Sequence, residues 1–467
     1  MRGRKSSTAV VLTVAVGMLA GCGVGGNAEA KLKELGKDEQ ATIKVMSMYD
    51  ERMFYQQFGA LFSAKYPNID VQVVSTQGAI KFTPDTDYNK EITKFIDEQK
   101  PDVLILTLDQ YEKMAGEGRL YELDSVIKQD KFDIAGILPS VLGAIKSRSG
   151  EKLYGLAPGF SAQALFYNKT LFTAQGVPLP QDEMTWEQVL ELARRFPNAG
   201  NDASRPYGIS LGTGDSLFRF IMMLGQTKGL NFVDASTMTM TMKSEGWKKV
   251  AQQSLDAFKS KAIYQSKDQF RSGTMEEYYK QEPFIGGKVA MTLNGAYYLD
   301  TLKQAKTALK DGMPQWDLVS YPAEPGNPDS QSTITVTQIF AVNGQSPSVR
   351  AAWEFVKYIN SDEFARVTSK APTMGNFPSR TTYMKDAEGH NLEAFYKGKG
   401  NSAALGKSLA GVPESFVGQL YGIAEQQFKD AMDGKITLDE ALQAIQDKGQ
   451  AALTKAKQEE EQKKKEK

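Results

Sequence analysis

The stretch Pro101-Asp102-Val103-Leu104-Ile105-Leu106 decides the fold class that the sequence predicts. Valine, leucine and isoleucine follow one another here without a polar residue, which is typical of a strand buried on both faces of a parallel sheet. Residues 42–48 and 69–74 predict two earlier strands, and apolar residues at helical spacing predict a helix after each of them. This β-α-β-α-β order predicts an α/β fold in which a mostly parallel sheet has helices on both faces.

Polar residues follow the predicted strands at the place where such a sheet binds ligands. The ligand crevice of an open α/β sheet lies beyond the carboxyl ends of its strands. Tyr49 and Asp50 come directly after the first strand, and Asp109 comes after the third. We expect these side chains to contact a ligand, although each of them could equally cap a helix or lie on a solvated loop.

The first 40 residues are not predicted to contribute to this fold. They begin with the sequence features of an export signal. A basic start precedes an apolar run at residues 9–20, which is too short to span a bilayer as a mature helix. We therefore interpret residues 1–21 as a signal peptide. Residues 22–40 are first glycine-rich and then charged, which predicts a tether that joins no core.

The signal ends in Leu19-Ala20-Gly21-Cys22. Small residues just before a cysteine, at the end of an apolar run, resemble the lipobox of bacterial lipoproteins. The resemblance implies that Cys22 is diacylated, becomes the mature N-terminus and holds the body on the extracytoplasmic face of the cell membrane. The alternative is an ordinary secretory signal with an incidental cysteine.

Composition excludes several classes of site. Cys22 is the only cysteine among 467 residues, so the exported body has no disulfide, no thiolate metal cluster and no cysteine nucleophile. His390 is the only histidine, which excludes a metal site built from several imidazoles. We expect no cofactor. Without residues 1–21 the formal charge is −3, which gives no indication of nucleic acid binding.

Six short motifs resemble one known family. They are Pro101-Asp102-Val103, Leu153-Tyr154-Gly155-Leu156, Phe166-Tyr167-Asn168-Lys169, Thr185-Trp186-Glu187, Met291-Thr292-Leu293-Asn294-Gly295 and Ala351-Ala352-Trp353-Glu354-Phe355. In this order, over residues 41–455, they are similar to the family 1 extracellular solute-binding proteins of ABC importers, the group that includes maltodextrin-binding protein. Each motif is weak alone, but the series is specific.

The resemblance implies a two-lobed clamp of the periplasmic-binding-protein type (type II), in which each lobe is a mostly parallel sheet flanked by helices. The expected division is lobe 1 at 41–148 and 290–342, lobe 2 at 154–288 and 344–412, C-terminal helices at 413–455 and a charged tail at 456–467. The resemblance also implies a monomer that performs no reaction and delivers its ligand to the permease subunits of an ABC importer.

The resemblance further implies a carbohydrate ligand. Maltodextrin-type members place an aromatic platform for sugar rings directly after the Asn-Gly turn, and the matching residue is Tyr297, with Tyr298 beside it. A tyrosine offers an apolar face to a sugar ring and a hydroxyl for hydrogen bonds. An oligosaccharide or a smaller sugar is therefore the expected ligand.

Other positions match the family less completely. Asp109 corresponds to an acidic residue of such members, but Leu106 replaces the aromatic residue that precedes it there. We expect Asp215 to accept hydrogen bonds from ligand hydroxyls and Phe416 to form another wall of the cleft. For each of these residues the alternative is a packing or surface role.

Two other functions remain open from the sequence. Gly208-Ile209-Ser210-Leu211-Gly212 fits the G-x-S-x-G elbow of α/β-hydrolases, and His390 follows it in the chain order of a catalytic triad. The elbow needs a helix directly after the serine, whereas Gly212-Thr213-Gly214 predicts a loop, and the surroundings of His390 predict a polar surface turn. A glycoside hydrolase needs only two carboxylates and is not excluded. A lipoprotein that uses the same clamp for sensing is the other alternative.

Overall fold

The computed structural model describes residues 31–36, 38–81, 88–196, 205–212, 216–265, 273–324, 333–370, 376–398 and 411–465. Cys22, the predicted signal peptide and Asp215 lie outside the described residues. In these ranges no helix has the length and apolar character needed to cross a membrane.

The first sheet has the strand order β2-β1-β3-β12-β4. Its strands are β1 (Ala41–Ser47), β2 (Ile69–Ser75), β3 (Val103–Leu106), β4 (Gly155–Leu156) and β12 (Ile339–Val342). β1 pairs in parallel with β2 and β3, whereas β12 pairs antiparallel with β3 and β4. The strands predicted at 42–48, 69–74 and 103–106 are therefore confirmed, and β3 is buried along its whole length as its unbroken apolar run predicts.

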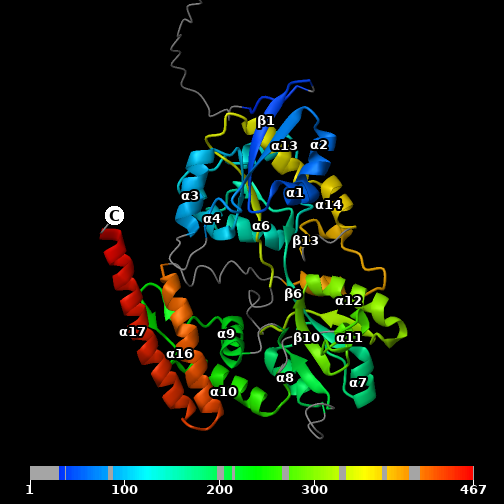
Figure 1. Cartoon of the computed structure of the whole chain (residues 1–467), viewed down its shortest axis with the longest axis vertical. Helices are drawn as coiled ribbons and strands as arrows, with labels where there is room; N and C mark the ends of the chain where they lie inside the picture. The colour runs from blue at the N-terminus through cyan, green and yellow to red at the C-terminus, as the bar shows by residue number, and fades with distance from the viewer. Residues whose placement is uncertain are drawn as a thin grey trace, which may run out of the picture.

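Helices surround this sheet in the upper half of Figure 1. They are α1 (Glu51–Phe54), α2 (Ala60–Lys65), α3 (Tyr88–Gln99), α4 (Leu108–Gly116), α5 (Asp124–Gln129), α6 (Pro139–Lys146), α13 (Val349–Ile359) and α14 (Asp362–Thr368). α1, α2 and α13 contact one another through aromatic rings. The ring centroid of Phe355 in α13 lies 5.9 Å from that of Phe54 in α1 and 4.9 Å from that of Phe62 in α2. The first sheet with these helices is called lobe 1 below.

The second sheet has the strand order β11-β6-β10-β7. Its strands are β6 (Gln163–Asn168), β7 (Tyr207–Ser210), β10 (Val289–Gly295) and β11 (Trp316–Val319). β10 pairs antiparallel with β6 and parallel with β7. Alternate residues of β6 join different cores: Phe166 packs with the first hydrophobic cluster, and Leu165 and Tyr167 pack with the second.

Helices cover both faces of the second sheet in the lower half of Figure 1. They are α7 (Lys169–Gln175), α8 (Trp186–Ala193), α9 (Leu217–Thr227), α10 (Glu245–Lys259), α11 (Met275–Lys280), α12 (Tyr297–Leu309), α16 (Glu414–Met432) and α17 (Leu438–Lys465). α16 and α17 pack against each other at the outer side, where they contact α9 and α10 respectively. This sheet with its helices is called lobe 2 below.

Several chain segments cross between the lobes. Residues 157–162 lead from β4 to β6. The described residues 320–324 and 333–338 lie between β11 and β12 in the sequence. Residues 369–370 follow α14, and the described residues 376–391 end at Asn391, whose amide donates to Asp317 of β11. The crossings contact one another through the short pair β5 (Gly159–Phe160) and β13 (Phe377–Pro378), and through a bridge between Ser161 and Thr335. The floor between the lobes is therefore built from segments far apart in the sequence.

The structure differs from the expected division of the lobes. β10 was expected in lobe 1 as the start of 290–342, but it pairs with β6 and β7 of lobe 2. α13 was expected in lobe 2 as part of 344–412, but it packs on β1 and β12 of lobe 1. The pattern of a segment predicts a strand or a helix, whereas its partners depend on contacts distant in the sequence.

Both ends of the body also differ from the expectation. α17 continues to Lys465, so residues 456–465 of the expected charged tail at 456–467 are helical, and Ala456 is buried in the second core. Glutamate, glutamine and lysine favour a helix, and the preceding turns of α17 are already anchored by packing. In the expected tether at 22–40, Leu32 and Leu35 pack against the first core.

Candidate ligand site

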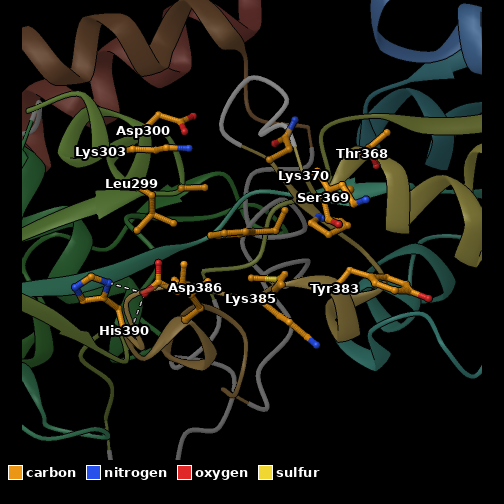
Figure 2. Close-up of a pocket in the computed structure, with 18 of the residues that line it drawn as sticks. Leu299, Asp300, Lys303, Thr368, Ser369, Lys370, Tyr383, Lys385, Asp386 and His390 are labelled. Carbon is orange, nitrogen blue, oxygen red and sulfur yellow. Dashed lines mark hydrogen bonds and ion pairs between the residues drawn. The ribbon is translucent and has the colours of Figure 1, made fainter. Parts of the chain in front are cut away.

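A cavity of about 380 Å³ lies between the two lobes. Its volume falls within the roughly 300–1,000 Å³ that is usual for small-molecule sites. Crossing segments contribute Pro158, Gly159 and Gln338, and the remaining walls come from both lobes. Figure 2 shows side chains of lobe 2 on one side of the cavity and those of the end of α14 on the other.

α12 forms the wall on the lobe 2 side. Leu299, Asp300, Lys303 and Lys306 line the cavity from one helical face, as a spacing of three to four residues dictates. Burial raises the pKa of the Asp300 carboxyl above its ordinary value, although the nearby Lys303 opposes the shift. The position of Asp300 in the first turn of α12 favours its negative charge.

The opposite wall is the end of α14 and the segment that follows it. Thr368, Ser369 and Lys370 line the cavity there. The Thr368 hydroxyl donates a hydrogen bond of 2.9 Å to the carbonyl of Phe364, which holds it in the last turn of the helix. Tyr383 lines the same side, and its hydroxyl donates to Asp362 over 2.5 Å.

Trp316 and His390 close the cavity on the lobe 2 side. Their rings are stacked, with centroids 3.6 Å apart and an angle of 11° between the planes. His390 Nδ1 lies 2.7 Å from Asp386, and only 11% of the His390 side chain is exposed. The predicted polar surface turn is present, with residues 387–389 exposed. The imidazole of His390 is nevertheless largely buried, because it packs against the flat face of Trp316 in β11.

Three of the predicted ligand contacts follow the strands of the first sheet. Tyr49 lines the cavity and is half-buried. Asp50 instead caps α1, where its carboxylate accepts a hydrogen bond of 2.8 Å from the Met53 amide. Asp109 has a side chain that is 76% exposed and lies 3.6 Å from Arg148. For Tyr49 and Asp109, contact with a ligand stays a prediction.

The predicted aromatic contacts separate into different environments. Tyr297 is 52% exposed, and its hydroxyl donates to Asn294 over 2.7 Å. Tyr298 is 4% exposed and packs edge-on against Phe166 in the core. Successive residues of a helix point about 100° apart, so both tyrosines cannot face the same cleft. Phe416 is fully buried in the second core rather than facing the cleft.

Asp300, Lys303 and Trp316 line the cavity but were not among the predicted site residues. The first two follow the Asn-Gly turn on the same helix as Tyr297, so their spacing could have placed them on one face. Nothing local marks Trp316, because it reaches the cavity only through the pairing of β11 with β6. The end of α14 was missed for the same reason.

The G-x-S-x-G motif has a structural explanation. A Cβ added at Gly208 would lie 2.2 Å from the carbonyl oxygen of Ala193, so glycine is needed where β7 passes α8. The Ser210 hydroxyl accepts a hydrogen bond of 3.2 Å from the Gly212 amide, and Gly212 has a φ of 69°. Thr213 and Gly214 of the predicted loop lie outside the described residues, so the loop after Ser210 stays a prediction.

Residues 50–365 match the family described as bacterial extracellular solute-binding protein. The chain belongs to this family. The match covers the second sheet, every strand of the first sheet except β1, and the two crossings that lie between β4 and β12 in the sequence. The motifs of the sequence therefore predicted the family correctly.

Solved structures share the fold of this solute-binding protein. The sugar-binding protein MalE of Xanthomonas citri is 18% identical with a TM-score of 0.61 and covers 90% of this chain and 99% of its own. A sugar transporter protein of Rhizobium etli in an open conformation is 20% identical with a TM-score of 0.60, covering 88% and 99%. An ABC substrate-binding protein of Listeria monocytogenes in complex with cycloalternan is 19% identical with a TM-score of 0.56, covering 89% and 100%. The predicted two-lobed α/β fold is confirmed.

Proposed function

We propose that this solute-binding protein captures a small carbohydrate between its lobes and delivers it to the permease of an ABC importer. The observation that carries the proposal is the cavity of about 380 Å³ with walls from both lobes. A ligand there contacts α12 of lobe 2 and the end of α14 of lobe 1 at once. Such a ligand favours the closed arrangement by the difference between its affinities for the closed and open states.

The chemistry of the lining supports a carbohydrate. The carboxylate of Asp300 and the amides of Gln57 and Gln338 are hydrogen-bond partners for sugar hydroxyls. The ring of Tyr49 offers a face on which a sugar ring can stack. The related structures include a sugar-binding protein and a complex with cycloalternan, which supports the same ligand class.

We further propose that a lipid on Cys22 holds the body outside the cell. The order of basic residues, apolar run and small residues before Cys22 supports this anchor. The protein then brings its ligand to the permease without performing a reaction. Uptake of the labelled ligand by cells that lack this chain distinguishes transport from sensing. If the protein serves transport, uptake is lost. If it is a sensor, uptake through the induced permease remains intact.

A thermal-shift screen tests the ligand class. The soluble body that begins after Cys22 is heated with mono- and oligosaccharides, and amino acids, peptides and polyamines serve as controls. A ligand that binds only the native state raises the melting temperature by mass action. A saturable shift with one class of saccharide is the expected result. A shift with an amino acid or a polyamine alone would contradict the carbohydrate assignment.

Asp300→Asn is expected to weaken binding of the saccharide found in this screen by about tenfold to a hundredfold, because a hydrogen bond to a charged group contributes about 1.5–3 kcal/mol. Calorimetric titration measures the affinity of each variant. Asp311→Asn, an exposed residue beyond α12, is the matched control. Equal affinities of the two variants would exclude Asp300 as a contact.

Burial raises the pKa of the Asp300 carboxyl. On acidification, the affinity of the unaltered protein should therefore begin to fall at a higher pH than it would if Asp300 had the ordinary pKa of an aspartate. Calorimetric titration at several pH values measures this fall.

Tyr297→Ala tests the predicted aromatic platform. We expect binding to weaken by roughly threefold to tenfold, since an aromatic contact contributes about 0.5–1.5 kcal/mol. The melting temperature without ligand should change little, because the Tyr297 side chain is half-exposed. Tyr297→Phe keeps the ring and should retain most of the affinity. If the alanine variant binds as tightly as the unaltered protein, the platform lies elsewhere.

A further inference from the structure

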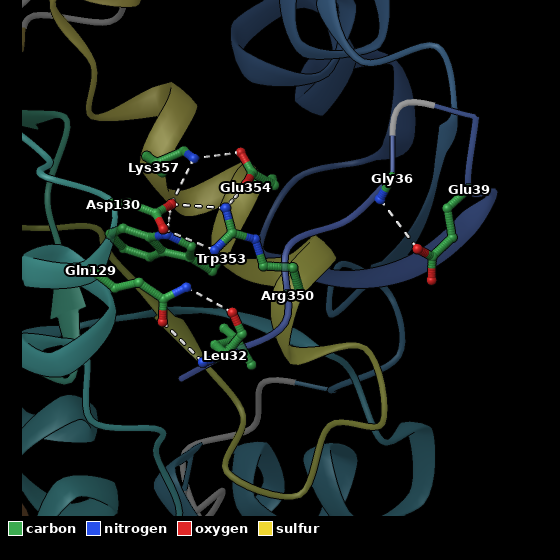
Figure 3. A network of polar contacts seen from close by, with 9 residues as sticks. All are labelled: Leu32, Gly36, Glu39, Gln129, Asp130, Arg350, Trp353, Glu354 and Lys357. Carbon is green, nitrogen blue, oxygen red and sulfur yellow. Dashed lines mark hydrogen bonds and ion pairs between the residues drawn. The ribbon is translucent and has the colours of Figure 1, made fainter. Parts of the chain in front are cut away.

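The segment that precedes β1 is bound to lobe 1 by a side-chain amide. The backbone N–H of Leu32 donates to Gln129 Oε1 over 2.9 Å, and Gln129 Nε2 donates to the carbonyl of Leu32 over 2.7 Å. Figure 3 shows both hydrogen bonds. One glutamine thus satisfies both polar backbone groups of a single residue, as a neighbouring strand would do.

Packing and further hydrogen bonds continue this attachment to the first strand. Leu32 and Leu35 are partly buried against the first core. Glu39 accepts a hydrogen bond of 3.1 Å from the Gly36 amide, and Asn68 donates one of 2.9 Å to the carbonyl of Glu39. The described part of this segment is therefore attached to lobe 1 at Leu32, Leu35 and Glu39.

Gln129 sits on a firmly held part of lobe 1. The next residue, Asp130, accepts hydrogen bonds of 2.9 Å from both terminal nitrogens of Arg350. It also accepts bonds from Trp353 Nε1 at 3.0 Å and from Lys357 at 2.9 Å. Three residues of α13 thus fix the end of α5, and with it the amide that binds Leu32 (Figure 3).

We propose that this docked segment makes lobe 1 the membrane-proximal lobe and leaves lobe 2 free to move. The proposal rests on the lipid anchor at Cys22 in the proposed function. At roughly 3.3–3.6 Å per residue, the chain from Cys22 to Leu32 reaches at most about 36 Å, whereas undocking back to β1 would extend this limit to about 70 Å. The docking site at α5 is thereby held near the bilayer, whatever ligand the cavity takes.

Hydrogen exchange on the soluble body tests the docking without any lipid. The Leu32 amide should be protected in the unaltered protein and should exchange at least tenfold faster in Gln129→Ala. Lys128→Ala changes an exposed residue of the same helix and should leave the protection unchanged. Exchange of the Leu32 amide in the unaltered protein at the rate of an unstructured peptide would overturn the proposal.

Energy transfer on vesicles tests the orientation with the full lipidated chain. Cys22 is the only native cysteine, so an introduced cysteine is the single free thiol after acylation. A donor dye is attached through Lys128→Cys beside the docking site or through Lys249→Cys on α10, which lies at the opposite end of the molecule from β1 in Figure 1. With acceptor dye on lipid headgroups, transfer should be stronger from position 128, and Gln129→Ala should reduce the difference.

The outcomes separate this inference from the proposed function. Equal transfer from the two positions, or a difference that Gln129→Ala leaves unchanged, would overturn the membrane-proximal lobe even if the protein binds sugar. Failure of the full chain to bind vesicles would overturn both the anchor and the orientation. Sugar binding by the soluble body is measured independently and does not depend on either result.

Discussion

Asp130→Asn should lower the free energy of unfolding by about 3 kcal/mol, the lower end of the cost of removing one partner from a buried ion pair. The Asp130 side chain is almost entirely buried between α5 and α13. Its removal leaves Arg350 and Lys357 with Glu354 as their remaining carboxylate in this cluster. Urea denaturation monitored by circular dichroism measures the loss.

The same aspartate gives the stability a specific pH dependence. Burial alone would raise the pKa of Asp130, but hydrogen bonds from Arg350, Lys357 and Trp353 outweigh it and lower the pKa to about 2. Because the pKa is lower in the folded state, the stabilisation is complete above the ordinary pKa of 3.8 and is lost as the pH falls through about 2. The difference between the unaltered protein and Asp130→Asn should therefore shrink between about pH 4 and pH 2.

A surface pair provides the control for this variant. Asp97 pairs with Arg119, and its side chain is 60% exposed. Asp97→Asn should cost less than about 1 kcal/mol, because exposed ion pairs contribute little. If the two variants lose the same stability, the buried cluster does not stabilise lobe 1 in the way described.

Gly208→Ala should destabilise lobe 2 by about 3 kcal/mol, at the upper end of the usual cost of overpacking. The added Cβ would lie 2.2 Å from the carbonyl oxygen and 2.5 Å from the Cα of Ala193. Both are backbone atoms, so the clash can be relieved only by moving α8 away from β7. Thermal and urea unfolding measure the effect.

Gly418→Ala is the matched control for Gly208→Ala. Gly418 lies in α16, and a Cβ added there meets no atom within 4 Å. This variant should be stabilised by up to about 1 kcal/mol, because alanine has the higher helix propensity. A neutral Gly208→Ala would show that the glycine is not required for packing and would reopen the interpretation of the G-x-S-x-G motif.

The candidate site differs from its prediction in several residues. The sequence indicates where a strand or helix ends, but it does not indicate which residues of different elements come into contact. Residues after the strands were predicted to face the crevice, and Tyr49 does line the cavity. Asp50 follows the same strand, but a helix begins directly after it, so its carboxylate is used by the Met53 amide. A helix N-cap and a ligand contact require the same residue types, and the local sequence does not distinguish them.

The cavity itself joins residues that no local pattern connects. Asp300 is brought to the cavity by the start of α12, whereas Thr368 ends α14 in the other lobe and Lys370 follows it. Their meeting depends on how the crossings place one lobe against the other. The packing of Tyr298 and Phe416 in the two cores depends likewise on which helix faces cover each sheet.

The sequence by itself determined the three parallel strands β1, β2 and β3 and the α/β class, because the period of apolar residues and an unbroken buried run are local properties. It also determined the family, through short motifs in a constant order. Only the tertiary structure decided that β10 joins β6 and β7, that α13 covers the first sheet, and that Gln129 binds the backbone of Leu32. Each of these depends on hydrogen bonds and packing between distant residues, whose partners local periodicity does not specify.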